Sequence, residues 1–243
     1  MSSYITLEEE IEIIKKLENY DTPTITNVVA TYPGSETCLS LYHPWETNWY
    51  TDDSVRAMYP ELGRRCGFAV TCTYGLPDAT VPAGPTTGDV IQAIGDSPKP
   101  VILLIKQDFP EYIKRKNGLC GGNMATAFHS AGCVGIISDG PSRDIDEVRE
   151  IGIQYMLTGA TPGHGPMAVR SVNTPVSICG MDVAPGEIVH MDENGAVKFP
   201  RKYLREVLEN CEKLHAIEAK KMAMLGSTSD VTKLRRYMKG IYD

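Results

Sequence analysis

The most constraining feature of the sequence is the stretch from Cys120 to Glu147, which reads CGGNMATAFHSAGCVGIISDGPSRDIDE. After its glycine pair, apolar residues recur at helical spacing, and Gly132 stands where a helix commonly ends. The continuous apolar run from Cys133 to Ile137 is typical of a strand buried on both faces, and the Asp-Gly-Pro sequence after it ends the strand. The stretch therefore predicts a turn, a short helix, a buried strand and a polar turn, as in an α/β core.

The polar turn at the end of this stretch carries Arg143 and Asp144 side by side, with Glu147 three residues later. A strand end is the usual position of binding sites in α/β proteins. An arginine can hold a carboxylate through two parallel hydrogen bonds, and an adjacent ionised aspartate can bind a divalent cation. The free amides at the start of the helix at Asn123 suit a carboxylate or phosphate. The pattern predicts a site for a small acid and a metal, and a surface Arg-Asp ion pair beside a turn is the alternative.

The complete spacing of this stretch is more specific than any of its parts. Gly-Gly-Asn, a helix, and then Gly-x-x-Gly-Ile-Ile-x-Asp-Gly-x-x-Arg-Asp-x-x-Glu resembles the signature of the RraA-like family. That family joins 4-hydroxy-4-methyl-2-oxoglutarate aldolases to regulators of ribonuclease activity A. The resemblance covers residues 66–225, and its other matching blocks are Gly88-Asp89-Val90, Gly152-Ile153-Gln154, Thr161-Pro162, Pro185-Gly186-Glu187 and Asp192-Glu193-Asn194-Gly195-Ala196-Val197.

The resemblance implies an α/β fold: a β/β/α layered sandwich of the swivelling phosphohistidine-domain type, with a mixed sheet and a long C-terminal helix. With 243 residues and 42% hydrophobic content, the chain can bury a core as one domain. We therefore expect a single RraA-like domain over residues 1–243. Its expected parts are N-terminal helices in 1–31, an insertion in 32–65, the core in 66–199, and the C-terminal helix and tail in 200–243.

Local patterns predict the individual elements. Thr6 and Glu9 form a capping box that begins a helix, and Asn194-Gly195 is a hairpin turn between the last two strands. Helices are expected over residues 7–18, 22–29, 123–131, 146–150 and 200–225. Strands are expected over residues 66–73, 90–94, 101–105, 133–137, 153–157, 175–179, 187–191 and 196–199.

The segment 32–65 contains both tryptophans, Trp45 and Trp49, and has no sustained periodicity. Long irregular segments in compact domains are commonly lids, binding loops or subunit contacts, and buried tryptophans are common interface anchors. A surface loop whose aromatic residues close over the core is an equally good interpretation. We expect His129 and His164 to face solvent, because the first lies off the apolar helix face and the second in a flexible loop.

Composition limits the partners and the compartment. A net charge of −7, with no long run of lysine or arginine, argues against a nucleic-acid surface. Seven cysteines without a Cys-x-x-Cys pair fit neither a disulfide framework nor a zinc site, so we expect the reduced cytoplasm. The apolar runs are too short to span a membrane and the beginning of the chain is unlike a signal peptide, so we expect no membrane partner.

The family resemblance implies a lyase that uses Mg²⁺ or Mn²⁺ and acts on small 2-keto acids, as a 4-hydroxy-2-oxo acid aldolase, an oxaloacetate decarboxylase or both. Both reactions must release the enolate of pyruvate. By resemblance, Asp144 is the metal ligand, Arg143 binds the substrate, and Glu147 orients Arg143 or serves as a helix N-terminal charge. The substrate carboxylate is expected on the backbone of Gly121, Gly122, Asn123 and Met124. The alternative is a non-catalytic protein that binds and regulates a ribonuclease. Such regulators can lack the aspartate found here at Asp144.

One position departs from the aldolases of the family. Many of them have an acidic residue, which holds metal-bound water, where this chain has Gly122 followed by Asn123. An asparagine lacks the charge of that acid, so metal affinity or substrate choice can differ. Family active sites also receive a glutamate from the C-terminal helix of an adjoining subunit, for which Glu218 is the candidate here. The resemblance therefore implies a homo-trimer or a hexamer.

Overall fold

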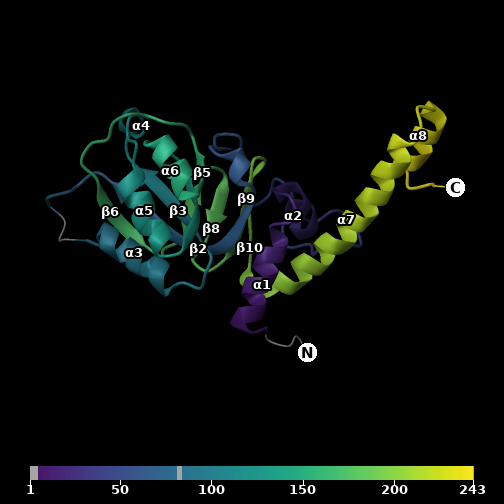
Figure 1. Cartoon of the computed structure of the whole chain (residues 1–243), viewed down its shortest axis with the longest axis horizontal. Helices are drawn as coiled ribbons and strands as arrows, with labels where there is room; N and C mark the ends of the chain where they lie inside the picture. The colour runs from purple at the N-terminus through teal and green to yellow at the C-terminus, as the bar shows by residue number, and fades with distance from the viewer. Residues whose placement is uncertain (1–4, 81–83, 243) are drawn as a thin grey trace.

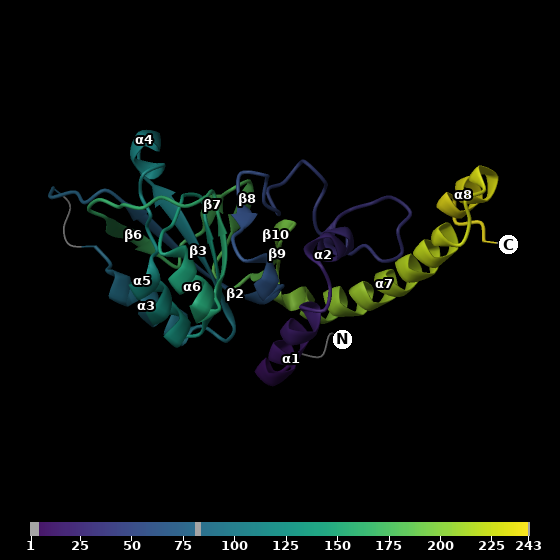
Figure 2. The same cartoon turned by 45° about the horizontal axis from the view of Figure 1, so that its top comes forward.

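The computed structural model describes residues 5–80 and 84–242. Figure 1 and Figure 2 show a body built around one large sheet, from which the C-terminal helix projects as an arm. The helices are α1 Leu7–Leu17, α2 Thr22–Val29, α3 Thr87–Asp96, α4 Glu111–Lys114, α5 Gly122–Ser130, α6 Ile145–Ile151, α7 Leu204–Gly226 and α8 Val231–Met238, with 3-10 turns η1 Pro60–Leu62 and η2 Arg201–Tyr203. The strands are β1 Arg56–Ala57, β2 Arg65–Gly75, β3 Val101–Asp108, β4 Cys133–Ser138, β5 Gln154–Leu157, β6 Ala168–Val172, β7 Val176–Ile178, β8 Met181–Val183, β9 Ile188–Asp192 and β10 Gly195–Phe199.

The large sheet is mixed. Within the described residues it has eight strands in the order β1-β5-β4-β3-β2-β9-β10, and β6 pairs with β2 outside this path. Strands β2, β3, β4 and β5 are parallel to one another, whereas β1, β6, β9 and β10 add antiparallel pairs. The β7–β8 hairpin forms a separate two-stranded sheet. Because the parallel strands are adjacent, their carboxyl ends lie along one edge, where α/β proteins place their sites.

The two faces of the sheet carry different layers. Leu103 and Ile105 of β3 belong to a buried cluster that includes Phe128 of α5, and α3, α5 and α6 lie together on this face in Figure 1. Leu104, which lies between them in the strand, belongs to a second cluster with Ile178 of the β7–β8 hairpin. This alternation explains why the central strands are apolar throughout. The α/β class, the mixed sheet and the long C-terminal helix are confirmed, and the assignment to the swivelling phosphohistidine-domain type stays a prediction.

Most of the predicted elements are confirmed to within one or two residues. The capping box at the start of α1 is present, because Thr6 Oγ1 accepts from the Glu9 amide and Glu9 accepts from the Thr6 amide. Strands β9 and β10 form the predicted hairpin, in which Gly195 has a φ of +128°. Gly132 follows α5 with a φ of +109°, as expected of a helix C-terminal glycine.

The strand predicted over residues 90–94 is wrong, because this segment belongs to helix α3. Val90 and Ile94 are fully buried, whereas Gln92, midway between them, is exposed. An alternating strand would bury Gln92 as well. The amide of Thr86 donates to the carboxylate of Asp89 at 2.6 Å, which completes a capping box and begins the helix. The spacing of four residues, and not the short apolar run, was the decisive signal.

The two tryptophans of the segment 32–65 lie in different environments. Trp49 is 2% exposed and packs in the cluster formed by α1, α2 and α7, so it closes over the core. Trp45 is 91% exposed and has a φ of +65°. Trp49 therefore fits the interpretation in which aromatic residues close over the core, and a role of the segment as a lid, binding loop or subunit contact stays a prediction. Strands β1, β6 and β8 and helices α4 and α8 were not predicted, and all of them are short.

Helix α7 is packed along only part of its length. Val207, Leu208 and Cys211 are buried against the body, whereas Ile217 and Met222, farther along the helix, are 53% and 66% exposed. The predicted apolar face therefore continues past the point where the body ends (Figure 2). In the part of the chain that the structure describes, none of the helices combines the length and apolar character needed to cross a bilayer.

Candidate active site

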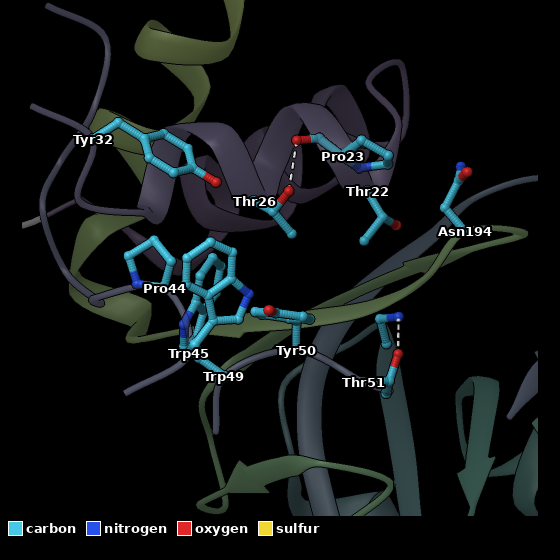
Figure 3. A pocket seen from close by; sticks show the side chains of 11 residues that line it. Thr22, Pro23, Thr26, Tyr32, Pro44, Trp45, Trp49, Tyr50, Thr51 and Asn194 are labelled. Atoms are coloured by element: carbon cyan, nitrogen blue, oxygen red, sulfur yellow. Dashed lines mark hydrogen bonds between the residues drawn. The ribbon is translucent and has the colours of Figure 1, made fainter. Parts of the chain in front are cut away.

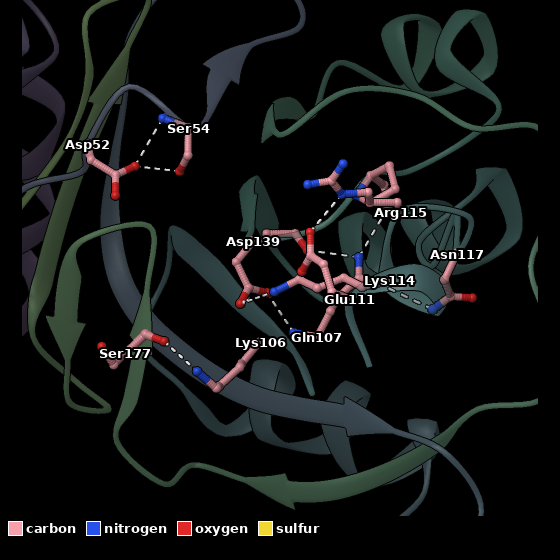
Figure 4. A network of polar contacts seen from close by, with 12 residues as sticks. Asp52, Ser54, Lys106, Gln107, Glu111, Lys114, Arg115, Asn117, Asp139 and Ser177 are labelled. Atoms are coloured by element: carbon pink, nitrogen blue, oxygen red, sulfur yellow. Dashed lines mark hydrogen bonds and ion pairs between the residues drawn. The ribbon is translucent and has the colours of Figure 1, made fainter. Parts of the chain in front are cut away.

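The turn that follows β4 is held in place by Asp139. Its carboxylate accepts a hydrogen bond from the Gln107 amide at 2.7 Å and from Lys114 Nζ at 2.6 Å (Figure 4). Two residues beyond Gly140, Ser142 Oγ donates to the carbonyl of Cys120 at 2.5 Å, which ties the turn to the glycine pair. The predicted strand end therefore has a fixed geometry when it reaches Arg143.

Asp144 has a strained backbone and an unexpected partner. Its φ and ψ are 57° and 42°, in the left-handed region that non-glycine residues adopt rarely and at a cost of about 1–2 kcal/mol. Although it is the first residue before α6, its side chain does not cap that helix. Instead, its Oδ2 accepts a hydrogen bond of 3.0 Å from the amide of Gly122, the first residue of α5. The strain therefore aims the carboxylate at the positive end of the neighbouring helix.

Arg143 lies beside this carboxylate and is only partly paired. Its Nε is 3.5 Å from Asp144 Oδ2, within ion-pair distance, yet Nε is buried and has no hydrogen-bond partner among the described residues. The side chain passes across Gly118 and Gly121. A Cβ added to Gly118 would lie 3.0 Å from Arg143 Cβ, and a Cβ added to Gly121 would lie 3.0 Å from Arg143 Nε. Because the side chain is 34% exposed, the guanidinium can still reach a ligand. A buried donor without a partner is a position where a ligand acceptor would be stabilised.

Glu147 occupies the space beside the second glycine of the pair. A Cβ added to Gly122 would lie 2.2 Å from Glu147 Oε2, so the carboxylate lies against the helix start where a side chain of residue 122 would begin. Glu147 is not within ion-pair distance of Arg143 in the described part of the chain. The departure at Gly122 is thus accompanied by an acidic group that reaches the same place from α6.

The arrangement can bind an anion together with a cation. The amides of Asn123 and Met124 lack partners within the described residues, and they face the N-terminal end of α5, which favours negative charge. Asp144 and Glu147, however, place two carboxylates at the same end. No group of three or more histidine, cysteine or acidic residues suited to a metal occurs within residues 5–80 and 84–242. A cation here would take its remaining ligands from water and substrate, as Mg²⁺ commonly does, so these residues fit a Mg²⁺ or Mn²⁺ ion.

Other groups near the site have structural roles. Burial raises the pKa of Cys120 to about 12, so this thiol is protonated and is not a nucleophile. Tyr155 Oη donates to the Cys120 carbonyl at 2.6 Å and, with Ser142, fixes the approach to the glycine pair. Sequence reasoning missed both residues, and their only signal was their place in buried strand and turn positions. His129 and His164 are exposed, as predicted.

Two surface cavities do not include the predicted catalytic residues. One of about 610 Å³ lies at the same sheet edge and is lined by Asp139 and Thr158 among others, but not by Arg143, Asp144 or Glu147. Glu218 lines a groove of about 290 Å³ between α7 and the α1–α2 turn, with Arg64 and His215. Figure 1 and Figure 2 both place α7 away from α5 and α6, so Glu218 does not reach the site within one chain.

A family model described as RraA-like, Aldolase/RraA, matches residues 45–198, which is more than half of the chain. The chain belongs to the RraA-like family. The 4-hydroxy-4-methyl-2-oxoglutarate aldolase of Thermus thermophilus is 31% identical over 86 residues, which are 35% of this chain and 52% of that protein. This chain therefore spans about half the length of the curated relatives that it matches.

Solved structures share the fold of this chain. An uncharacterized protein from Pseudomonas syringae matches with a TM-score of 0.72 and 18% identity, covering 97% of this chain and 96% of that one. Streptomyces coelicolor RraAS2, described as an unusual member of the RNase ES inhibitor RraA protein family, matches with a TM-score of 0.66 and 20% identity over 87% of this chain and 96% of that one. The relatives of this chain thus include proteins named as aldolases and proteins named as inhibitors.

Proposed function

We propose that this RraA-like protein is a divalent-metal-dependent lyase that cleaves or decarboxylates small 2-keto acids. The observation that carries the proposal is the Asp144 carboxylate, held at 3.0 Å by the Gly122 amide beside an Arg143 Nε that has no hydrogen-bond partner in the described residues. A surface ion pair needs neither the left-handed backbone of Asp144 nor the glycines that make room for Arg143. Residues held in this region of φ and ψ cluster at functional sites.

Each group has a stated task in this proposal. Arg143 holds the carboxylate of the keto acid, and the amides of Asn123 and Met124 hold a second acidic or polar group of the substrate. Asp144 binds Mg²⁺ or Mn²⁺, and Glu147 adds charge on the far side of Gly122 or holds a metal-bound water. The bound cation would supply Lewis-acid stabilisation of the charge that develops on the keto oxygen as pyruvate enolate forms. Oxaloacetate decarboxylation and 4-hydroxy-2-oxo acid cleavage have this requirement in common.

Pyruvate release tests the proposal directly. The protein is incubated with oxaloacetate and with 4-hydroxy-2-oxo acids, in magnesium, in manganese and in chelator, and pyruvate is measured. Release that disappears with chelator and returns with either metal is the expected result. An absence of release from every substrate in every metal would contradict the lyase and favour the alternative, a non-catalytic regulator of a ribonuclease.

We also propose a homo-trimer or a dimer of trimers in the cytoplasm, with Glu218 of an adjoining subunit near the site. The exposed apolar residues along the distal half of α7, including Ile217 and Met222, support an assembly, because a lone helix projecting from a body rarely leaves such residues uncovered. Light scattering at micromolar concentration measures the mass. A monomer would contradict this part of the proposal and leave the metal chemistry at Asp144 untouched.

A further inference from the structure

A further pocket lies on the other side of the molecule from the glycine pair. It has a volume of about 290 Å³ and is formed by α2, the 32–65 segment and the β9–β10 hairpin (Figure 3). We call it the insertion pocket and define it by Thr26, Trp45, Trp49, Tyr50, Thr51 and Asn194. Figure 1 and Figure 2 both place α2 and β10 away from α5 and α6. The pocket is therefore separate from the site at Arg143.

One wall of the insertion pocket is aromatic and firmly packed. Trp49 stacks on Tyr42 with ring centres 5.3 Å apart and planes 12° apart, and Tyr50 meets it edge-on at 4.6 Å. Trp45 at the rim is different, since it is 91% exposed and has a φ of +65°. Holding a large side chain in the left-handed region costs about 1–2 kcal/mol, and exposing it to water recovers none of that. A ligand that covers the Trp45 ring would give this conformation its stabilising contact.

The polar groups that line the insertion pocket offer hydrogen bonds that the protein does not use. Thr51 Oγ1 accepts from the Ala196 amide at 2.9 Å, which leaves its hydroxyl proton free to donate (Figure 3). Asn194 donates through Nδ2 to Asp192, so its amide oxygen remains an acceptor. The Nε1 of buried Trp49 has no hydrogen-bond partner among the described residues. Unused donors and acceptors therefore stand next to an aromatic surface.

No charged side chain is among the described residues that line the insertion pocket. A ligand with a net charge would lose its hydration on entering the pocket and would meet no side chain of opposite charge there, which is unfavourable. The lining therefore favours a neutral ligand that presents an apolar face to the aromatic rings and hydroxyl groups to Thr51 and Asn194. A volume of 290 Å³ is at the small end of ligand pockets, which favours a single ring.

We propose that the insertion pocket binds a neutral carbohydrate ring. A pyranose satisfies each condition, because its C–H face covers an aromatic ring while its rim of hydroxyl groups donates and accepts at once. Asn194 and Thr51 bind the hydroxyl groups, and Trp45 covers the ring. This proposal does not depend on the lyase proposal, since the two sites share no residue.

Intrinsic fluorescence tests the proposal, because the two tryptophans of the chain both line this pocket. The full-length protein is titrated with methyl glucoside, methyl galactoside, methyl mannoside and N-acetylglucosamine to about 50 mM, a range that saturates a site with a Kd of about 1 mM. We expect a saturable blue shift with at least one of them. Trp45→Asn removes the ring but tolerates the left-handed backbone, and it should weaken binding at least tenfold while Trp49 still reports. Tyr112→Ala, which removes a 73% exposed aromatic residue from α4, is the matched control and should bind as the parent does.

Three titration results would overturn the carbohydrate site. They are the lack of a saturable change with any glycoside, saturation by adenine or uracil in place of the glycosides, and unweakened glycoside binding by Trp45→Asn. The ligand-free protein is also diluted while its tryptophan emission is followed. A blue-shifted emission that moves to the red on dilution would assign the pocket to a subunit interface and would overturn the carbohydrate site. Arg143→Lys should bind the glycoside as the parent does, and a loss of binding there would contradict the separation of the two sites.

Discussion

Replacing Gly121 with alanine tests the close fit between the glycine pair and the residues that follow β4. A Cβ at position 121 would lie 2.3 Å from Asp144 Oδ2 and 3.0 Å from Arg143 Nε, whereas ordinary contacts of a Cβ begin at 3.4 Å. The Asp144 carboxylate must therefore retreat by about 1 Å, which removes its hydrogen bond from the Gly122 amide. The change places a methyl group at the site and leaves every charged side chain in the chain.

The structure predicts a large loss of rate and a small loss of stability. A hydrogen bond to a charged group contributes about 1.5–3 kcal/mol, and the lower value applies because Asp144 is 31% exposed and water can replace the amide. For a chain of this length that corresponds to a fall in Tm of roughly 3–6 °C. Misplacing the reacting groups by about 1 Å costs on the order of a hundredfold in rate, or about 2.7 kcal/mol in barrier. Pyruvate release from oxaloacetate should therefore fall about a hundredfold.

Gly95→Ala is the matched control for this experiment. Gly95 lies near the end of α3, and a Cβ there would meet no atom within 4 Å. Alanine should raise the stability of the helix by at most about 1 kcal/mol and leave turnover unchanged. If Gly121→Ala turns over within about threefold of the parent, a difference of only about 0.7 kcal/mol in barrier, the close fit is not part of the mechanism.

Three further predictions concern charge. Asp144→Asn keeps an acceptor for the Gly122 amide but loses the charge. Mn²⁺ binding, followed by EPR, should therefore weaken at least tenfold with little change in Tm. Unchanged binding would show that Asp144 is not the metal ligand. Arg143→Lys keeps the charge but loses the paired hydrogen bonds, so decarboxylation should fall on the order of a hundredfold, whereas an exposed ion pair would contribute at most about 1 kcal/mol of stability and nothing to rate. Burial lowers the pKa of His190 from 6.5 to about 4, so its contribution to stability is present above pH 6.5 and is lost as pH falls toward 4, by about 3 kcal/mol in all. Tm measured from pH 7 to 4.5 should fall more steeply for the parent than for His190→Gln, and equal slopes would contradict this assignment.

The stretch from Cys120 to Glu147 could be predicted because its local signals agree with one another. Glycine positions, helical spacing, the apolar run and the turn residues all indicate the same order of elements, and the structure has that order in α5, β4 and α6. The segment 90–94 could not be predicted in the same way, because five residues with four apolar ones fit either period. The Thr86–Asp89 capping box, which lies outside these five residues, and the burial of Val90 and Ile94 in one cluster decide for the helix.

The candidate site shows a second limit of sequence reasoning. The pattern located Arg143 and Asp144 at a strand end, as the structure has them, because that position depends only on the local order of elements. It could not indicate that Asp144 would cap α5, since that hydrogen bond joins residues 22 apart and requires a left-handed backbone. Nor could it indicate that Glu147 would lie against Gly122. Both contacts depend on how α5 and α6 pack together.

These contacts give a physical reason for the glycines of the motif. Gly118 and Gly121 leave room for the Arg143 side chain, and Gly122 leaves room for the carboxylate of Glu147. Asp144 and Glu147 then place two negative charges at the start of α5, against the single positive charge of Arg143. A keto acid brings further negative charge, which the helix N-terminus, equivalent to about half a positive charge, does not offset. The geometry therefore favours an order in which a divalent cation binds before the acid, because only then does the site present a net positive charge to the substrate.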